Sequence, residues 1–561
     1  MANRFRNSHI CVAERIRTGS FVRAFRNPFA ILLAFTLLFS CASASAAEDK
    51  ETDQNGSKLT LPSYVMDGMV LQQNKITTLN GSTAKSMSGQ TISVTLRGGK
   101  NQYNASSRIS KNGKFSVQLP KIKGSLTQYI MKFMVADTMV KTVNDVYVGN
   151  LFIASGQSNM EINYNDYFKS DSLFKTSTSL HYTRNDIPRS INDKYVHFLS
   201  PNKILDTKNY PLRDFEKKSW LTAAGDDVNY LGYIPQYFAQ QLRKQYPNIP
   251  IGFIQTAWGG TAISHHIKGG DIYKSRVAPL QGLGVAGVLW YQGEDDSGSM
   301  DLALRYDISF ATLVNDYRNL FNDATLPFLY VQLARYDGYG YIYDTIVRNA
   351  QLGILSNPVV ASHKNLGMTV SIDTDKGTPK AIHPLGKEIV AQRMANQWIA
   401  MNEHKAVPSG PLPKEAHLDT NDKSTAIITF QEGTAVKLQA KRPNYTTSAT
   451  IDNIANATNT PLSGFQVADG DGSMHNAIAT ITGSTLRIHS DEVKRVAQIQ
   501  YLWQSNPSCL SIVYNSSNLP MSPFTLNVNQ KPIRIDSLFL SGRAPCQSSS
   551  EQTIMCGTYI L

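Results

Sequence analysis

Short apolar runs alternate with segments of helical periodicity between residues 149 and about 400. Each apolar run is followed by a cluster of small or polar residues. Strands that are almost wholly apolar and that alternate with helices are typical of a parallel sheet covered on both faces. The expected strands are 151–154, 251–254, 285–290, 328–331 and 368–372, and the expected helices are 234–243, 306–321 and 346–355.

The regions on either side of this α/β segment have β character. Polar and apolar residues alternate in 91–96 and 113–119, and β-rich runs recur at 426–430 and 477–481. A chain of 561 residues is also too long for one hydrophobic core. We therefore predict a signal peptide (1–46), a linker (47–60), an N-terminal β domain (61–148), an α/β domain (149–405), a C-terminal β-rich domain (406–530) and a tail (531–561).

The first 46 residues have the composition of an export signal. Six arginines precede an almost wholly apolar run at 29–39, and small residues follow at 42–46. The apolar run is too short to span a bilayer comfortably, which favours a signal peptide over a transmembrane helix. We expect no transmembrane segment in the mature chain. We predict export to the periplasm or outside the cell, with cleavage near Ala44 or Ala46. Alternatively, the stretch ending at Cys41 resembles a lipoprotein signal, which would leave Cys41 lipidated as a membrane anchor.

The charge of the chain does not indicate a nucleic-acid partner, and its cysteine spacing does not indicate a metal site. The formal net charge of +12 includes +5 from the predicted signal peptide, which leaves 12 − 5 = +7 for the mature chain. No basic run has interleaved aromatic residues, so we expect no nucleic-acid partner. Cys546 and Cys556 could form a disulfide in an oxidising compartment, Cys509 is expected as a buried thiol, and no cysteine spacing indicates a metal site.

Polar residues gather where the predicted strands end. The first strand stops at Gly156-Gln157-Ser158-Asn159, and a serine on a strand-to-helix turn is typical of hydrolytic nucleophiles. The glycine usually found two residues after such a serine is replaced by Met160, so this turn needs support from the other strand ends. These ends supply glycines, an amide, carboxylates and an imidazole, which are the groups needed for acyl transfer. They are residues 256–261, 291–296, 373–375 and 382–384.

These segments resemble those of the sialate O-acetylesterases, a family within the SGNH (GDSL-like) hydrolases. The resemblance covers about 61–525. It implies a three-layer α/β/α sheet of SGNH type flanked by N-terminal and C-terminal β-sandwich-like domains. It also implies an exported serine esterase that hydrolyses O-acetyl esters on carbohydrates, such as sialic acid or xylan, through an acetyl-enzyme intermediate and without a cofactor. The matching segments are 69–73, 156–161, 258–261, 290–294, 382–384, 462–465 and 519–524.

The resemblance also implies roles for individual residues. Ser158 would be the nucleophile and His383 the general base. The oxyanion hole would consist of the N–H groups of Ser158 and of Gly259 or Gly260, together with the Gln292 amide.

One position departs from the family pattern. Many SGNH enzymes have an aspartate three residues before the histidine, where this chain has Lys380, and a lysine cannot accept the imidazole N–H. The orienting carboxylate must then come from elsewhere. Glu294 is the first candidate, and Asp373 and Asp375 are alternatives. Lys380 also motivates a different hypothesis, in which the chain is a carbohydrate-binding protein that has lost its chemistry.

Four further polar residues near these segments have less specific interpretations. We expect Asp295 and Asp296 to be solvated. Arg348 and Gln351, one helical turn apart, are expected to support the sheet edge rather than bind substrate. Residues 163–220 are expected to shape the substrate pocket.

Overall fold

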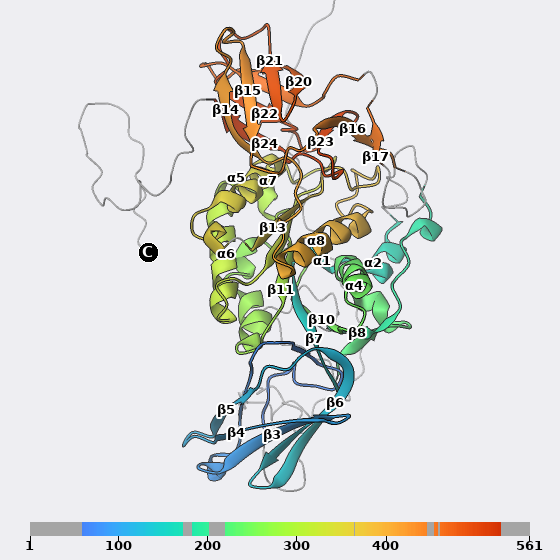
Figure 1. Cartoon of the computed structure of the whole chain (residues 1–561), viewed down its shortest axis with the longest axis vertical. Coiled ribbons are helices and arrows are strands. Elements are labelled where there is room, and N and C mark those ends of the chain that lie inside the picture. The colour runs from blue at the N-terminus through green and yellow to red at the C-terminus, as the bar shows by residue number, and fades with distance from the viewer. Residues whose placement is uncertain are drawn as a thin grey trace, which may run out of the picture. The chain divides into compact units, whose positions relative to one another are not determined.

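The computed structural model describes residues 59–171, 182–200, 219–363, 365–445, 454–457 and 460–528. The predicted signal peptide, Cys41 and the Cys546–Cys556 pair lie outside these residues. The described chain has a mixed α/β fold, with a central, mostly parallel sheet and additional β-rich regions (Figure 1).

The central sheet has the strand order β13-β12-β11-β7-β10-β8-β9. Every pair along this path is parallel except β8 with β9. The strands predicted from apolar runs are β7, β10, β11, β12 and β13, so the parallel sheet is confirmed. The bounds are β7 Thr138–Gly156, β8 Asp193–Leu199, β9 Leu221–Ala223, β10 Ile251–Gln255, β11 Gly287–Tyr291, β12 Phe328–Gln332 and β13 Leu366–Val370.

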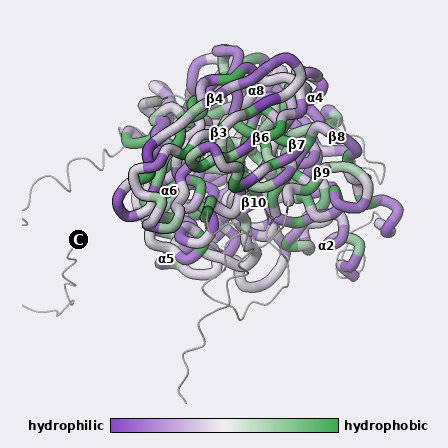
Figure 2. The backbone as a smooth tube through the Cα atoms, turned by 90° about the horizontal axis from the view of Figure 1, so that it is seen from below, coloured by the Kyte–Doolittle hydropathy of each residue, from purple (hydrophilic) through white to green (hydrophobic). Residues whose placement is uncertain are grey.

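The helices are α1 Ser158–Glu161, α2 Tyr164–Lys169, α4 Tyr233–Gln245, α5 Met300–Leu304, α6 Tyr306–Leu320, α7 Asp344–Gly353 and α8 Lys387–Asn402. The predicted helices correspond to α4, α6 and α7. Polar and apolar residues are interleaved along these helices, as expected for helices that cover a sheet with one side, and Figure 2 shows this for α4 and α6.

Aromatic contacts show that helices cover both faces of the sheet. Phe152 of β7 packs edge-on against Phe238 of α4 and Trp398 of α8, with ring centroids 5.0 and 5.2 Å apart. Ser155, three residues later on β7, lies 3.0 Å from the hydroxyl of Tyr317 on α6. Residues three apart on a strand point to opposite faces, so α4 and α8 lie on one side and α6 on the other. This is the three-layer arrangement that the sequence predicts.

Strand β7 also belongs to the N-terminal β region. Up to Val148 it pairs with β6, and from Asn150 onward it pairs with β10. The predicted domain boundary between residues 148 and 149 therefore falls inside one strand and not in a linker. The other strands here are β1 Val70–Gln72, β2 Thr77–Ser82, β3 Thr91–Gly98, β4 Asn101–Arg108, β5 Lys114–Leu119 and β6 Ser125–Val135.

In its described residues, the C-terminal β region contains three antiparallel sheets. The predicted runs at 426–430 and 477–481 correspond to β15 and β20, and Cys509 is a buried free thiol as expected. Within the residues that the structure describes, every helix is too short or too polar to span a bilayer. The sheets are β14 Pro413–Leu418, β15 Thr425–Phe430, β21 Thr485–His489 and β20 Ile478–Thr482; β17 Ile454–Asn456, β16 Gln439–Pro443 and β23 Ile512–Tyr514; and β19 Met474–Asn476, β18 Phe465–Ala468, β22 Gln498–Tyr501 and β24 Phe524–Asn527.

A buried histidine on β8 should make this fold sensitive to acid. His197 packs against Tyr147 of β7 with ring centroids 4.8 Å apart, and burial lowers the pKa of His197 to about 4. An unfolded chain binds a proton at this histidine below pH 6.5, whereas the folded chain resists it. The free energy of unfolding is therefore lost as pH falls from about 6.5 to about 4, by at most about 1.4 kcal/mol per pH unit.

We predict that His197→Phe, which keeps a ring against Tyr147, loses less stability between pH 7 and pH 5 than the wild type. Urea unfolding at both pH values measures the difference. His417→Gln, at an exposed histidine on β14, is the control and should follow the wild type. Equal pH dependence in His197→Phe and the wild type would contradict this assignment.

Candidate active site

The serine lies at the carboxyl end of the central strand, where β7 turns into α1. Gly156 has φ of 128°, and a Cβ there would lie 2.1 Å from the carbonyl oxygen of Tyr291 on β11. Only glycine fits this close approach. The next N–H, that of Gln157, donates to the same carbonyl at 2.9 Å. Ser158 is then the first residue of α1 and is partly exposed.

The glycine loop after β10, residues 256–261, packs directly on Ser158. A Cβ at Gly259 would lie 3.1 Å from the Cβ of Ser158. The Gly259 N–H donates to the carboxylate of Glu161 at 3.0 Å, which fastens the loop to α1. The N–H groups of Ser158 and Gly260 have no hydrogen-bond acceptor among the described residues. Of the expected oxyanion donors, these two are open and that of Gly259 is engaged.

The predicted oxyanion role of Gln292 does not fit the structure. Its amide nitrogen donates to the Thr261 carbonyl at 3.1 Å and to Asp296 at 2.5 Å, and its amide oxygen accepts from Tyr306 at 3.0 Å. A primary amide has two donor hydrogens, and both are used here. The buried Gln292 side chain therefore fixes the glycine loop from behind instead of facing a substrate oxygen.

The expectation that Asp296 is solvated is wrong. Its side chain is buried and accepts hydrogen bonds from the Gln292 amide and from the backbone N–H of Ile263 at 2.9 Å. Burial raises the pKa of Asp296 to about 6. The signal in the sequence is its position four residues after Gln292, which allows one turn to bring both side chains to the glycine loop. Asp295 is partly exposed.

The histidine loop, residues 382–384, is anchored on both sides of His383. The preceding carbonyl, that of Ile382, accepts from the Asn159 amide at 3.0 Å, and the following one, that of Pro384, accepts from the Tyr167 hydroxyl at 2.7 Å. His383 itself is partly exposed. Because Asn159 directly follows Ser158, this contact brings the histidine loop to the serine helix.

A glycine allows the same loop to turn into α8. Gly386 has φ of 86°, and a Cβ there would lie 1.8 Å from the carbonyl oxygen of Thr374. Any larger residue would therefore push the histidine loop away from the end of β13.

Glu294 contacts Asn159. The Asn159 amide donates to Oε1 of Glu294 at 2.5 Å, and the carboxyl group is buried. Burial raises the pKa of Glu294 to about 7. Glu294 and the Ile382 carbonyl thus share the two donor hydrogens of one amide. This geometry makes Glu294 a positioning residue for Asn159.

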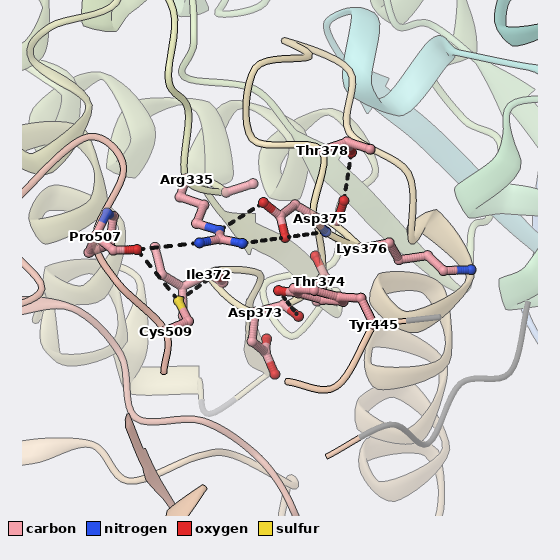
Figure 3. A network of polar contacts seen from close by, with 12 residues as sticks. Arg335, Ile372, Asp373, Thr374, Asp375, Lys376, Thr378, Tyr445, Pro507 and Cys509 are labelled. Atoms are coloured by element: carbon pink, nitrogen blue, oxygen red, sulfur yellow. Dashed lines mark hydrogen bonds and ion pairs between the residues drawn. The ribbon is translucent and has the colours of Figure 1, made fainter. Parts of the chain in front are cut away.

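The two alternative carboxylates are held in ion pairs close to the end of β13. Figure 3 shows the pair that Asp375 forms with Arg335. Asp375 accepts two bonds from Arg335, at 2.7 and 3.0 Å. Asp373 accepts two from Arg393, at 2.7 and 2.8 Å, and one from the Tyr514 hydroxyl at 2.8 Å. These bonds fix the chain that leads to the histidine loop and leave neither carboxylate for orienting an imidazole.

The remaining predicted residues have supporting or exposed positions. Gln351 donates to the Gln292 carbonyl at 3.1 Å and accepts from the Leu333 N–H, which confirms its expected support of the sheet. Arg348 is fully buried and donates to backbone carbonyls that include that of Leu333. Lys380 is exposed. Among the described residues, no three His, Cys, Asp or Glu side chains are grouped so that they could hold a metal ion.

Comparisons with known proteins show that the chain is similar to members of one family. Residues 148–396 match the family model described as carbohydrate esterase, sialic acid-specific acetylesterase. The chain is 23% identical to the sialate O-acetylesterase of Mus musculus, over 84% of this chain and 95% of that protein. It is 24% identical to that of Homo sapiens, over 64% of this chain and 74% of the human protein. A solved structure of a carbohydrate acetylesterase from Xanthomonas citri matches with a TM-score of 0.66 and 25% identity, over 83% of this chain and 99% of that one.

We predict that Asn159→Ala lowers kcat for a small acetyl ester by about 10- to 100-fold with little change in KM, because the histidine loop loses its anchor to the serine helix.

The variant Glu294→Gln tests whether Glu294 acts through Asn159 or directly on the His383 imidazole. It keeps an oxygen acceptor for Asn159, so most of the turnover should remain if Glu294 acts through Asn159.

Steady-state kinetics and thermal unfolding of both variants provide the measurement. Asn396→Ala, at an exposed position on α8, is the matched control and should keep the wild-type rate. A loss of 100-fold or more in Glu294→Gln would show instead that the carboxylate acts directly on the imidazole.

Proposed function

Because the chain belongs to the sialate O-acetylesterase family and is a carboxylic ester hydrolase, we propose that it removes O-acetyl groups from carbohydrates through an acetyl-enzyme intermediate. The alternative of a binding protein without chemistry, which Lys380 suggested, is not favoured by these relatives. The names of the relatives support an acetylated carbohydrate as the substrate.

One observation carries the proposal. The residue after Ser158 donates a hydrogen bond to the carbonyl before His383, so the serine helix and the histidine loop are direct neighbours. The glycine loop lies against the same serine. The proposed nucleophile, base and backbone N–H donors therefore belong to segments that meet at the carboxyl ends of parallel strands, where ligands bind in open α/β sheets.

In the first half of the reaction, the Ser158 hydroxyl oxygen attacks the acetyl carbonyl carbon while His383 takes the hydroxyl proton. The oxyanion that forms is stabilised by the N–H groups of Ser158 and Gly260. The bond from the acetyl carbon to the sugar oxygen then breaks, and His383 returns its proton to that oxygen. The deacetylated sugar leaves, and the acetyl group remains on Ser158.

In the second half, water attacks the acetyl carbon and His383 takes a proton from it. The same N–H groups stabilise the second oxyanion. The bond to Ser158 breaks, His383 protonates the serine oxygen, and acetate leaves. Glu294 contributes by holding Asn159, so that the histidine loop keeps its position through both halves.

We also propose that the chain is exported. The support is the arginine-rich, apolar and small-residue sequence of positions 1–46. Mass spectrometry of the mature protein should find an N-terminus just after Ala44 or Ala46. A lipidated Cys41 as the first residue would establish the lipoprotein alternative, and an uncleaved chain in the cytoplasm would contradict export.

We predict that Ser158→Ala lowers acetate release by at least about a thousandfold, because the nucleophile is lost while the oxyanion donors remain. An organophosphonate should label the wild type at Ser158, as read by peptide mass spectrometry, and should not label the variant. Ser106→Ala, at an exposed serine on β4, is the control and should keep both activity and labelling. Undiminished acetate release by Ser158→Ala would overturn the proposal.

A further inference from the structure

A tyrosine-rich loop follows β12 beside the candidate active site. Residues 336–343 contain four tyrosines within eight positions. Tyr339 at its tip is 97% exposed. An aromatic side chain offered to solvent on a loop next to a reaction centre is a common means of ligand recognition.

Backbone hydrogen bonds hold this loop in place between the segments that carry the chemistry. The N–H of Asp337 donates to the Pro379 carbonyl at 2.8 Å, in the segment that leads to the histidine loop. The N–H of Tyr343 donates to the Ser297 carbonyl at 3.0 Å, in the turn after β11. The tyrosines are thus presented from a fixed backbone, which lowers the entropy lost when they bind a ligand.

The loop forms one wall of a small pocket of about 20 Å³. Tyr336 and Tyr341 lie on this wall with ring centroids 5.9 Å apart and planes at 62°. Asn159, Glu294 and Ile382 also line the pocket. Two of these residues adjoin Ser158 and His383 in the chain, so the pocket lies beside the proposed reaction centre. The pocket is too small to enclose a sugar ring, so a ring would lie across its mouth, against the tyrosine side chains.

The charges of the pocket disfavour an anionic ligand. Glu294 and Asp344 contribute carboxyl groups to its lining, and Arg348 donates to the Asp344 carboxylate at 2.9 Å. Arg335 is the one basic side chain among the described lining residues, and Asp375 holds it through two hydrogen bonds of 2.7 and 3.0 Å. A carboxylate on the sugar would therefore find no unpaired basic side chain among the described lining residues. The apolar C–H face of an uncharged pyranose ring suits the tyrosine rings better.

We propose that Tyr336, Tyr339 and Tyr341 form a subsite for an uncharged pyranose ring of the acetylated glycan while its acetyl ester lies at Ser158. This inference rests on the proposed esterase function and adds to it the substrate class and the residues that recognise it.

The first test compares two substrates in the variants Tyr339→Ala and Tyr341→Ala. For an acetylated, uncharged xylo-oligosaccharide, KM should rise about tenfold, and kcat/KM should fall at least fivefold more than it does for p-nitrophenyl acetate, which has no sugar ring. Tyr339 is too exposed for its loss to disturb the core, so Tyr339→Ala keeps the test valid if the other variant folds poorly. Tyr103→Ala on β4 is the matched control and should match the wild type with both substrates.

The second test measures binding without chemistry. In a Ser158→Ala background, calorimetry should show that the tyrosine substitutions weaken binding of the same xylo-oligosaccharide about tenfold. Unchanged binding would overturn the subsite, and tighter binding of an O-acetylated sialic acid than of the xylo-oligosaccharide would overturn its preference for an uncharged ring. If Ser158→Ala still releases acetate, the esterase mechanism fails, whereas the subsite stands or falls on the binding measurement alone.

Discussion

The amide of Asn159 joins the three segments on which the site depends. It follows Ser158 at the start of α1, donates to Glu294 after β11, and donates to the Ile382 carbonyl before the histidine. Both acceptors are at least partly shielded from water, where hydrogen bonds are strong and an unpaired polar group is costly. Shifting any one segment would leave a buried group unpaired. The relative position of the serine and the histidine is therefore set by side-chain bonds behind them, before any substrate arrives.

A second layer of polar residues plays the same part for the glycine loop. Glu161 holds the N–H of Gly259 from the serine helix, and Gln292 holds the Thr261 carbonyl from the turn after β11. Asp296 in turn fixes Gln292. Gln292 and Asp296, whose polar side chains suggest a chemical role in the sequence, therefore hold backbone groups in place, and the N–H groups of Ser158 and Gly260 remain the open donors among the described residues.

The sheet and the serine turn could be predicted because both depend on local patterns of apolar residues and glycine. Helix α8 could not, because it buries polar residues such as Lys387, Glu388 and Gln397 and so lacks a clear polar face. The roles of Gln292 and Asp296 were also beyond local reasoning. Which hydrogen bonds an amide makes depends on partners such as Thr261, which are distant in the chain. Likewise, nothing near Asp373 or Asp375 in the sequence marks the arginines that neutralise them.

The C-terminal β region supplies partners to the catalytic sheet across a long stretch of chain. Arg348 donates to the carbonyls of Gln504 and Ser505, and Asp373 accepts from the Tyr514 hydroxyl. Gln504, Ser505 and Tyr514 are synthesised after all strands and helices of the central sheet. A nascent chain that has completed the whole parallel sheet would still hold a buried arginine and a buried aspartate without part of their bonding. A chain truncated before residue 504 would therefore possess the serine and the histidine but lack these bonds to Arg348 and Asp373.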